Sequence, residues 1–523
     1  MQKQHGDLFL SASAMDRLNL YKTIRLLRRS QSSVSERLSA RQNGEPLVTE
    51  VNLRQIASAT GRNYGSIYNI YNDLLAVLHD IVGDPHAELA VLFSVSEAQL
   101  RLHMIEQTAV YHYLQAALSG NYEHFDEFVA AEKVSRMTMM RHLRPMREMA
   151  DTFGVQMQPE ALSFAGEERH LRLFVMTMFW HATAGTDWPF GELSHESAER
   201  LVDTLYTALD CQPSNPVARE LSMYYLAIAS WRMGKGHLLS YRREDNVIDY
   251  PLPNLDLALG HGRFKDFVLP PMTRQQLMGE TEFGFFLMNF APVYLVAKDD
   301  ALAGTIDRYR RYAPTVYQLV ANFVQAFPAW SPTLGADDRQ LLLVNLLAVT
   351  CSVLTLGEDF NQLVAYVFNH DLQMQGEDPH YERMVRQTLT QVVLSEHLEG
   401  YIDWIDVLTH NYYRNLYQVR ALFHPQRTLR VALVLEQTSL EYVDLIAMLR
   451  QQAFVELLPS ADALIDADLV IQSASLALNL PAGVPVFHWE PNASADQFGE
   501  LFAVLVALWR EKRASTEANQ RRA

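Results

Sequence analysis

Apolar residues recur at helical spacing through most of the chain. Residues 15–29 predict an amphipathic helix, because their apolar side chains lie three or four residues apart. The spacing continues at residues 98–120 and 125–155, and at residues 51–81, which predict three helical pieces with a turn at Gly61. Residues 157–166 instead predict a strand, a turn and a second strand. Short helices that end in a hairpin are therefore expected over the first 190 residues.

Residues 167–424 are expected to be almost wholly helical, since they are rich in Leu, Val, Ala, Phe and Tyr at helical spacing. Prolines interrupt this pattern at several points, and proline cannot continue a helix because it lacks a backbone N–H. The interruptions divide the segment into two blocks, residues 189–304 and 305–424.

The pattern changes at Pro425. Four apolar runs that predict buried strands follow, at residues 429–435, 455–458, 467–472 and 484–489. Predicted helices lie at residues 442–452 and 497–512. Strands that alternate with helices predict a small α/β domain with a largely parallel sheet over residues 425–514, followed by a flexible tail at 515–523. The expected fold class is therefore mainly α with a C-terminal α/β domain.

Composition indicates a soluble, cytoplasmic protein. The 523 residues are 49% apolar, enough for several packed cores. The two cysteines, Cys211 and Cys351, are too few for a disulfide framework or a cysteine-based zinc cluster, which fits a reducing compartment. The N-terminus shows no basic start followed by an apolar run, and the longest apolar stretches are too short to span a bilayer. No membrane partner, metal or cofactor is expected.

The net charge of −17 is unevenly distributed along the chain. Residues 1–62 hold ten Lys and Arg against five Asp and Glu, and residues 133–147 hold five basic residues and no acidic one. Residues 191–523 hold 26 basic residues against 40 acidic ones. This asymmetry favours a polyanion-binding front and an acidic, self-associating rear, with chance variation of surface charge as the alternative.

The first candidate site is a helix-turn-helix at residues 53–75, in which Gly61 supplies the turn. Ile67, Ile70 and Leu74 are expected to anchor its second helix. The outer face of that helix is expected to contact phosphates and base edges through Arg62, Asn63, Tyr64, Ser66 and Asn69. An ordinary helical hairpin is the alternative interpretation.

The second candidate site is a helix-turn-helix at residues 125–143. Ser135 is expected to cap the reader helix, and Met139, Met140 and Leu143 to hold it inward. The predicted DNA-binding residues of this unit are Lys133, Ser135, Arg136, Thr138, Arg141, His142 and Arg144. Arginine offers bidentate contact with guanine, and phosphate contacts release counterions. A solvated basic face is the alternative interpretation.

Residues 128–190 resemble the helix-turn-helix region of the Mga/AtxA group of Gram-positive transcription regulators. The resemblance rests on S-x-x-T-x-x-R-x-L-x-P-M at residues 135–146, L-S-F-A-G-E-E at 162–168, L-R-L-F at 171–174 and W-P-F at 188–190. The domain order of that family extends the resemblance to nearly the whole chain.

The resemblance implies five domains in order along the chain. Residues 1–85 and 86–188 would form two helix-turn-helix domains, the second of them winged. Residues 189–304 and 305–424 would form two helical PTS-regulation domains, and 425–514 a domain like the IIB component of sugar transport. The implied function is transcription activation by a homodimer on double-stranded DNA, modulated by histidine phosphorylation from phosphocarrier proteins of the sugar phosphotransferase system.

His195 and His370 are the preferred phosphate acceptors, because each lies at a polar helix edge near acidic residues. The other eligible histidines are His237, His261, His380 and His397, and for each position an ordinary structural histidine is the alternative. A phosphate-carrying IIB domain uses a cysteine after its first strand, whereas residues 436–439 read Glu-Gln-Thr-Ser. We therefore expect the C-terminal domain to contact a partner or to dimerise.

Enzyme motifs are absent from the sequence, including G-x-x-x-x-G-K-S/T, H-E-x-x-H and G-x-S-x-G, so no catalytic activity is expected. Two other functions stay open. One is an RNA-binding antiterminator with the same regulatory domains, although such proteins begin with a β-rich module and this chain begins with helices. The other is a phosphocarrier or interaction protein that does not bind DNA.

Overall fold

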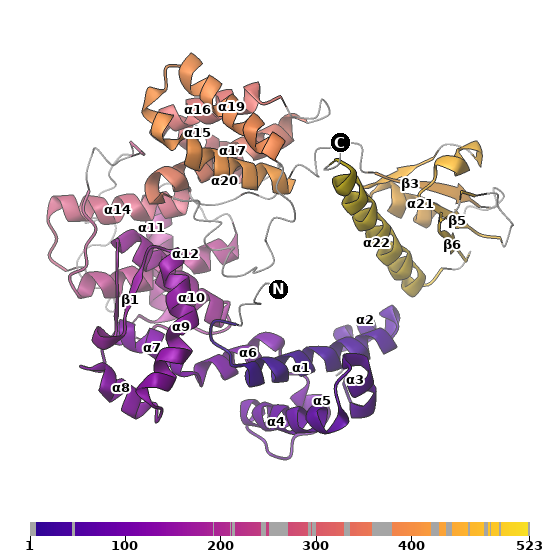
Figure 1. The fold of residues 1–523 in the computed structure, drawn as a ribbon, viewed down its shortest axis with the longest axis horizontal. Helices are drawn as coiled ribbons and strands as arrows, with labels where there is room; N and C mark the ends of the chain where they lie inside the picture. The colour runs from indigo at the N-terminus through magenta and orange to yellow at the C-terminus, as the bar shows by residue number, and fades with distance from the viewer. Residues whose placement is uncertain are drawn as a thin grey trace.

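The fold is described from a computed structural model. The described residues are 7–43, 48–191, 193–209, 211, 215–241, 247–249, 270–290, 294, 300–328, 335–357, 379–419, 428–435, 442–458, 461–474, 480–481, 483–490 and 493–520. As predicted, the chain is mainly helical, with a small parallel sheet near the C-terminus (Figure 1).

The first helices form a small bundle. They are α1 (Ala12–Gln31), α2 (Val34–Asn43), α3 (Leu53–Thr60), α4 (Tyr64–Val82), α5 (Leu89–Leu92) and α6 (Glu97–Glu106). The predicted three pieces at 51–81 are two helices, because the stretch after Asn63 contains no further break. Tyr21 of α1 is fully buried, and its hydroxyl donates to the carbonyl of Val95. Its ring stacks on Phe93 at 5.4 Å, which joins α1 to the segment before α6.

A second unit follows, and it contains the predicted hairpin. Its elements are α7 (Ala109–Ser119), α8 (Phe125–Ala131), α9 (Arg136–Thr152), β1 (Gln156–Gln158), a 3₁₀ turn (Pro159–Ala161), β2 (Ser163–Ala165) and α10 (Glu168–Thr183). The strands pair antiparallel, with Met157 opposite Phe164. Phe164 packs edge-on against the rings of Tyr113 and Phe174, at 6.0 and 5.3 Å. This packing fixes the hairpin between α7 and α10.

The helical body comprises α11 (His195–Ala208), α12 (Pro216–Gly234), α14 (Arg274–Asn289), α15 (Asp300–Tyr312), α16 (Pro314–Ala326), α17 (Ala336–Leu356), α19 (Pro379–Ser395), a 3₁₀ helix (Glu399–Trp404) and α20 (Ile405–Val419). Among the described residues, α17 alone is long and apolar enough to cross a membrane, but it is mostly buried in the bundle. There Thr350 and Tyr412 of α20 share a buried hydrogen bond of 2.6 Å. This burial makes α17 a core helix of the bundle.

The C-terminal elements are β3 (Leu429–Val434), α21 (Val443–Arg450), β4 (Val455–Leu457), a 3₁₀ helix (Ala461–Asp466), β5 (Leu469–Gln472), β6 (Val486–His488) and α22 (Ala495–Gln520). The strands are parallel, in the order β4-β3-β5-β6. All four predicted strands are confirmed. The last helix continues past the predicted end at residue 512, through the first part of the predicted tail, because Ala, Glu and Gln favour helix and no Gly or Pro stops it.

Apolar packing separates the C-terminal elements from the rest of the described chain. One connected core runs from Leu8 to Leu416, whereas Leu429 and Leu505 belong to a separate core. Helices α2 and α22 also touch: the backbone N–H of Val34, which begins α2, donates to the carboxylate of Asp496 in α22. The domain boundaries at residues 85, 188 and 304 stay predictions.

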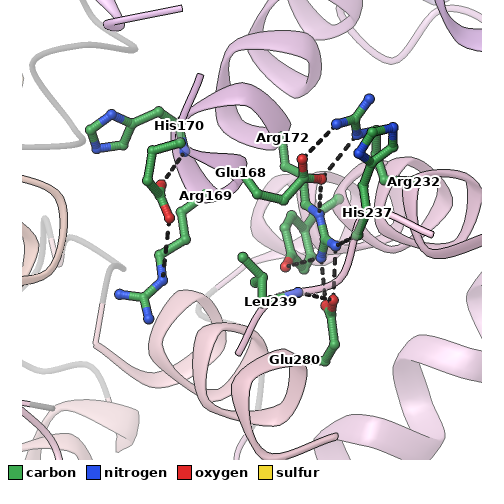
Figure 2. A network of polar contacts seen from close by, with 10 residues as sticks. Glu168, Arg169, His170, Arg172, Arg232, His237, Leu239 and Glu280 are labelled. Atoms are coloured by element: carbon green, nitrogen blue, oxygen red, sulfur yellow. Dashed lines mark hydrogen bonds and ion pairs between the residues drawn. The ribbon is translucent and has the colours of Figure 1, made fainter. Parts of the chain in front are cut away.

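A buried cluster of charges joins α10 to the helical body (Figure 2). The Arg172 side chain has no exposed surface. Its Nε donates to Glu168 at 2.9 Å, and its two terminal nitrogens donate to Glu280 of α14 at 2.5 and 2.9 Å. One of these nitrogens also donates to the carbonyl of His237 at 2.9 Å. Arg232 of α12 closes the cluster with two bonds to Glu168, at 2.9 and 2.6 Å.

The cluster is tolerated because every charged partner is compensated. A buried guanidinium without partners would be strongly destabilising. Burial by itself lowers the pKa of Arg172, but the Tyr225 phenol and the carboxylates of Glu280 and Glu168 raise it above its usual range. Arg172 therefore stays charged, and its position ties three helices together.

We expect Arg172→Met to destabilise the chain by about 3–5 kcal/mol, because it leaves the Glu280 carboxylate buried without its cation. The matched control is Arg200→Met, whose exposed partner Glu196 lies one turn away in α11 at 3.0 Å. This control should leave the urea midpoint unchanged. Urea unfolding monitored by circular dichroism measures both, and equal shifts for the two variants would contradict the assignment.

Candidate nucleic-acid interface

The first helix-turn-helix is formed by α3 and α4. Gly61 ends α3 with a φ of +66°, a conformation that glycine adopts without steric cost. The side chain of Asn63 then caps α4 by accepting from the N–H of Ser66 at 2.7 Å. Ile67 and Leu74 are buried as predicted, whereas the third predicted anchor, Ile70, is half-buried and packs against the same core.

The predicted contact residues of this unit lie at the start of α4. Asn63, Tyr64 and Asn69 are exposed, Ser66 is half-buried, and Arg62 is exposed and pairs with Asp16 of α1 at 2.8 Å. Tyr68, which sequence reasoning missed, stacks on Tyr64 at 6.2 Å and is also exposed. The signal was the spacing of four residues between the two tyrosines, which places both rings on one face.

A surface hollow of about 570 Å³ adjoins this unit, between the end of α1 and the start of α3. Arg28 and Arg54 contribute to its wall, together with Tyr64. Glu50 also lines the hollow, so both positive and negative side chains contribute to the wall.

The second helix-turn-helix is formed by α8 and α9. Lys133 lies in the turn with a φ of +54°, a region that side chains other than glycine rarely occupy. Ser135 caps α9 as predicted, since its hydroxyl oxygen accepts from the N–H of Thr138 at 3.1 Å. Met139 and Leu143 are buried, and Met140 is half-buried. One side of α9 is therefore held against the unit, and the opposite side is exposed.

The predicted contact residues of the second unit lie mostly on that exposed side. The exposed members are Lys133, Ser135, Arg136, Arg141, His142 and Arg144. Thr138 is half-buried, and its hydroxyl accepts a hydrogen bond from Ser135 at 2.9 Å. The side chains thus gather at the first half of α9, beside the hairpin.

Arg136 is held by carboxylates within the protein. It donates to Asp126 of α8 at 2.5 Å and to Glu160 at the hairpin tip, and it lies 5.1 Å from the centre of the Phe125 ring. The hydrogen bonds that Arg136 donates to Glu160 and Asp126 raise its pKa. Its charge is therefore neutralised locally, and a contact with DNA would have to replace these partners.

Arg141 differs from its neighbours. Arg144 donates to Glu148 one turn away at 2.8 Å, but within the described part of the chain Arg141 has neither a hydrogen bond nor an ion pair. Arg141 therefore presents an uncompensated positive charge at the centre of the exposed side of α9.

Met137 is a surface feature that sequence reasoning missed. It is 84% exposed, more than any other large hydrophobic residue of the described chain. The sequence feature that could have revealed this exposure is the position of Met137 between Arg136 and Thr138, two residues before the buried Met139.

The candidate phosphate acceptors are only partly covered by the structure. His195 begins α11, and its Nε2 lies 3.2 Å from Glu220 of α12, while its ring lies edge-on to Trp188 at 5.1 Å. His370 and His261 lie outside the described residues. His397 is exposed and lies 3.6 Å from Glu399. Burial lowers the pKa of His237, as do the positive charges near it, Arg232 first.

The second unit also meets the helical body through Lys235. Its ammonium donates to the carbonyl of Leu118 in the last turn of α7 at 3.1 Å, and lies 4.1 Å from the ring of Trp231. A hollow of about 630 Å³ opens at this seam and is lined by residues of α7, α10 and α12.

Comparison with protein-family models gave no match to the chain. Comparison with curated proteins gave no match either. The residues described above therefore carry the functional argument.

Replacing Lys133 tests the backbone conformation of the turn. Lys133→Gly and Lys133→Ala both remove the cation, but only glycine removes the steric cost of the positive φ. We expect Lys133→Gly to be more stable than Lys133→Ala by about 1 kcal/mol in urea unfolding. An alanine variant as stable as the glycine variant would show that the turn is not strained.

Proposed function

We propose that this chain is a sequence-specific, double-stranded DNA-binding transcription regulator that acts as a homodimer. Its activity is modulated by histidine phosphorylation from phosphocarrier proteins of the sugar phosphotransferase system. The observation that carries the proposal is the exposed side of α9, with the uncompensated Arg141 at its centre, next to an antiparallel hairpin.

The dimensions of α9 support this role. Its 17 residues give a length of about 25 Å, and the major groove of B-DNA is wide enough to admit an α-helix. Because Leu143 and Met146 are buried on the opposite side, Arg141 and Arg144 would face the groove. Guanine offers two acceptors there to a guanidinium, and phosphates accept the remaining cationic contacts.

Two acidic side chains limit non-specific attraction. Asp126 and Glu160 flank Arg136 and would repel phosphates that approach from their side. In a specific complex, a base or phosphate oxygen would take their place at the guanidinium. Weak binding to arbitrary DNA and stronger binding to a matched site follow from this exchange.

The rear of the chain supports assembly. A homodimer presents two copies of α9, and two-fold symmetry would match a pseudo-palindromic operator with half-sites about one or more helical turns apart. The acidic balance of residues 191–523 keeps that portion away from the DNA phosphates.

Phosphorylation of His195 would act on the packing between α11 and α12. The imidazole is exposed and lies beside the Glu220 carboxylate. A phosphate group adds strong negative charge at that point, which repels Glu220 and biases the two helices apart. Because α12 also carries Arg232, such a shift reaches the buried charge cluster at α10.

Removing Arg141 tests the DNA interface. We expect Arg141→Ala to weaken binding to a duplex selected by the wild-type chain from random sequences. The loss should be about 1–3 kcal/mol, and the preference for guanine at one position of each half-site should relax, since the contact between the Arg141 guanidinium and a guanine is lost.

Arg200→Ala, on α11, is the matched control and should bind like the wild type. A wild-type affinity that does not change with salt would overturn the proposal. Preference for a hairpin RNA over the duplex would instead favour the antiterminator function.

Phosphate transfer tests the regulatory part. After incubation with phosphoenolpyruvate and the general phosphocarrier proteins, we expect mass spectrometry to find phosphate on the peptide that contains His195. His195→Ala should lose this label, whereas His397→Ala, the control at another exposed histidine, should keep it. Label that appears only at residues 425–514 would contradict regulation and favour a carrier.

A further inference from the structure

A single apolar side chain stands on the exposed side of α9. Met137 is 84% exposed, although the helix buries Met139, Leu143 and Met146 on its other side. Met137 lies two residues before Met139, which corresponds to about 200° around a helix of 3.6 residues per turn. Its side chain therefore points away from the core of the unit.

Met137 shares its stripe of the helix with two arginines. Arg141 and Arg144 follow it at intervals of four and three residues, the spacing that places side chains above one another on one face. Arg136, the immediate neighbour, is turned aside by Asp126 and Glu160. The exposed stripe of α9 therefore consists of the Met137 thioether followed by the guanidinium groups of Arg141 and Arg144.

The chemistry of this stripe fits the floor of the major groove. The C5 methyl of thymine is the apolar group that a base pair presents there, next to the acceptors of guanine that arginine binds. Methionine is flexible and polarizable, so it adapts to such a methyl without a preformed pocket. The flanking cations make an apolar protein surface a poor partner for this stripe.

We propose that Met137 is a specificity-determining residue that reads a thymine methyl in the major groove. Arg141 lies four residues further along the helix, about 6 Å away, which is close to two base-pair steps. The preferred site therefore holds a thymine about two base pairs from the guanine that Arg141 contacts. This inference rests on the proposed DNA-binding function.

The test replaces single thymines by deoxyuridine in the duplex selected by the wild-type chain. This change removes only the methyl group. We expect one replacement per half-site to weaken wild-type binding about fourfold, the value of one buried methyl. Met137→Ala should bind the thymine and deoxyuridine duplexes equally, with its salt dependence unchanged, while Met137→Leu keeps part of the discrimination.

Ile465→Ala is the matched control, because Ile465 is 74% exposed but lies in the C-terminal α/β domain. It should discriminate like the wild type. Discrimination that persists in Met137→Ala, or a wild type that ignores every thymine methyl, overturns this inference and leaves salt-dependent DNA binding intact. Failure of the wild-type chain to bind any duplex would instead overturn the proposed function itself.

Discussion

The buried ion cluster around Arg172 is the interaction on which the arrangement of the described chain depends. Helix α10 begins directly after the hairpin, and its first turn carries Glu168 while its second carries Arg172. Both side chains are committed to helices of the body, Glu168 to Arg232 and Arg172 to Glu280. Because a buried charge cannot give up its partner cheaply, the hairpin and the body hold one relative position.

The same cluster joins the proposed reader to the proposed regulatory helices. Reader helix α9 lies against β1 and the hairpin, and the hairpin leads into α10. On the other side, α12 supplies Arg232 and α14 supplies Glu280, while His170 reaches the carbonyl of Leu356 at the end of α17. Movement of α12 or α14 therefore requires either movement of α10 or a broken ion pair. Lys235, which caps α7, is a second connection between the same parts.

Local sequence signals predicted most of the elements. Ser135 is a helix cap that acts within three residues, and Gly61 is a turn whose conformation glycine favours, so sequence alone sufficed for both. Asn63 was predicted only as a contact residue, and its role as the cap of α4 was not predicted. The strands after Pro425 were predicted because short apolar runs between polar turns are a strong local pattern. The same local rules placed Met139 and Leu143 inside and left Arg141 outside.

Contacts between distant residues could not be predicted in this way. Arg172 and Glu280 are 108 residues apart, and no local sequence pattern around either residue indicates that the two are in contact. Arg136 is held within the protein by its ion pair with Glu160. Glu160 reaches Arg136 only because the hairpin folds back beside α9. The exposure of Met137 was hidden for a simpler reason: sequence patterns assign methionine to the core.

The proposed function requires that the exposed side of α9 lies in a DNA groove. Hydrogen–deuterium exchange of the full chain, with and without the selected duplex, tests it most directly. We expect the duplex to protect residues 133–147 and the start of α4, and to leave exchange in α16 and α17 unchanged. Protection confined to residues 191–523, with the amides of α9 exchanging as in the free chain, would contradict it.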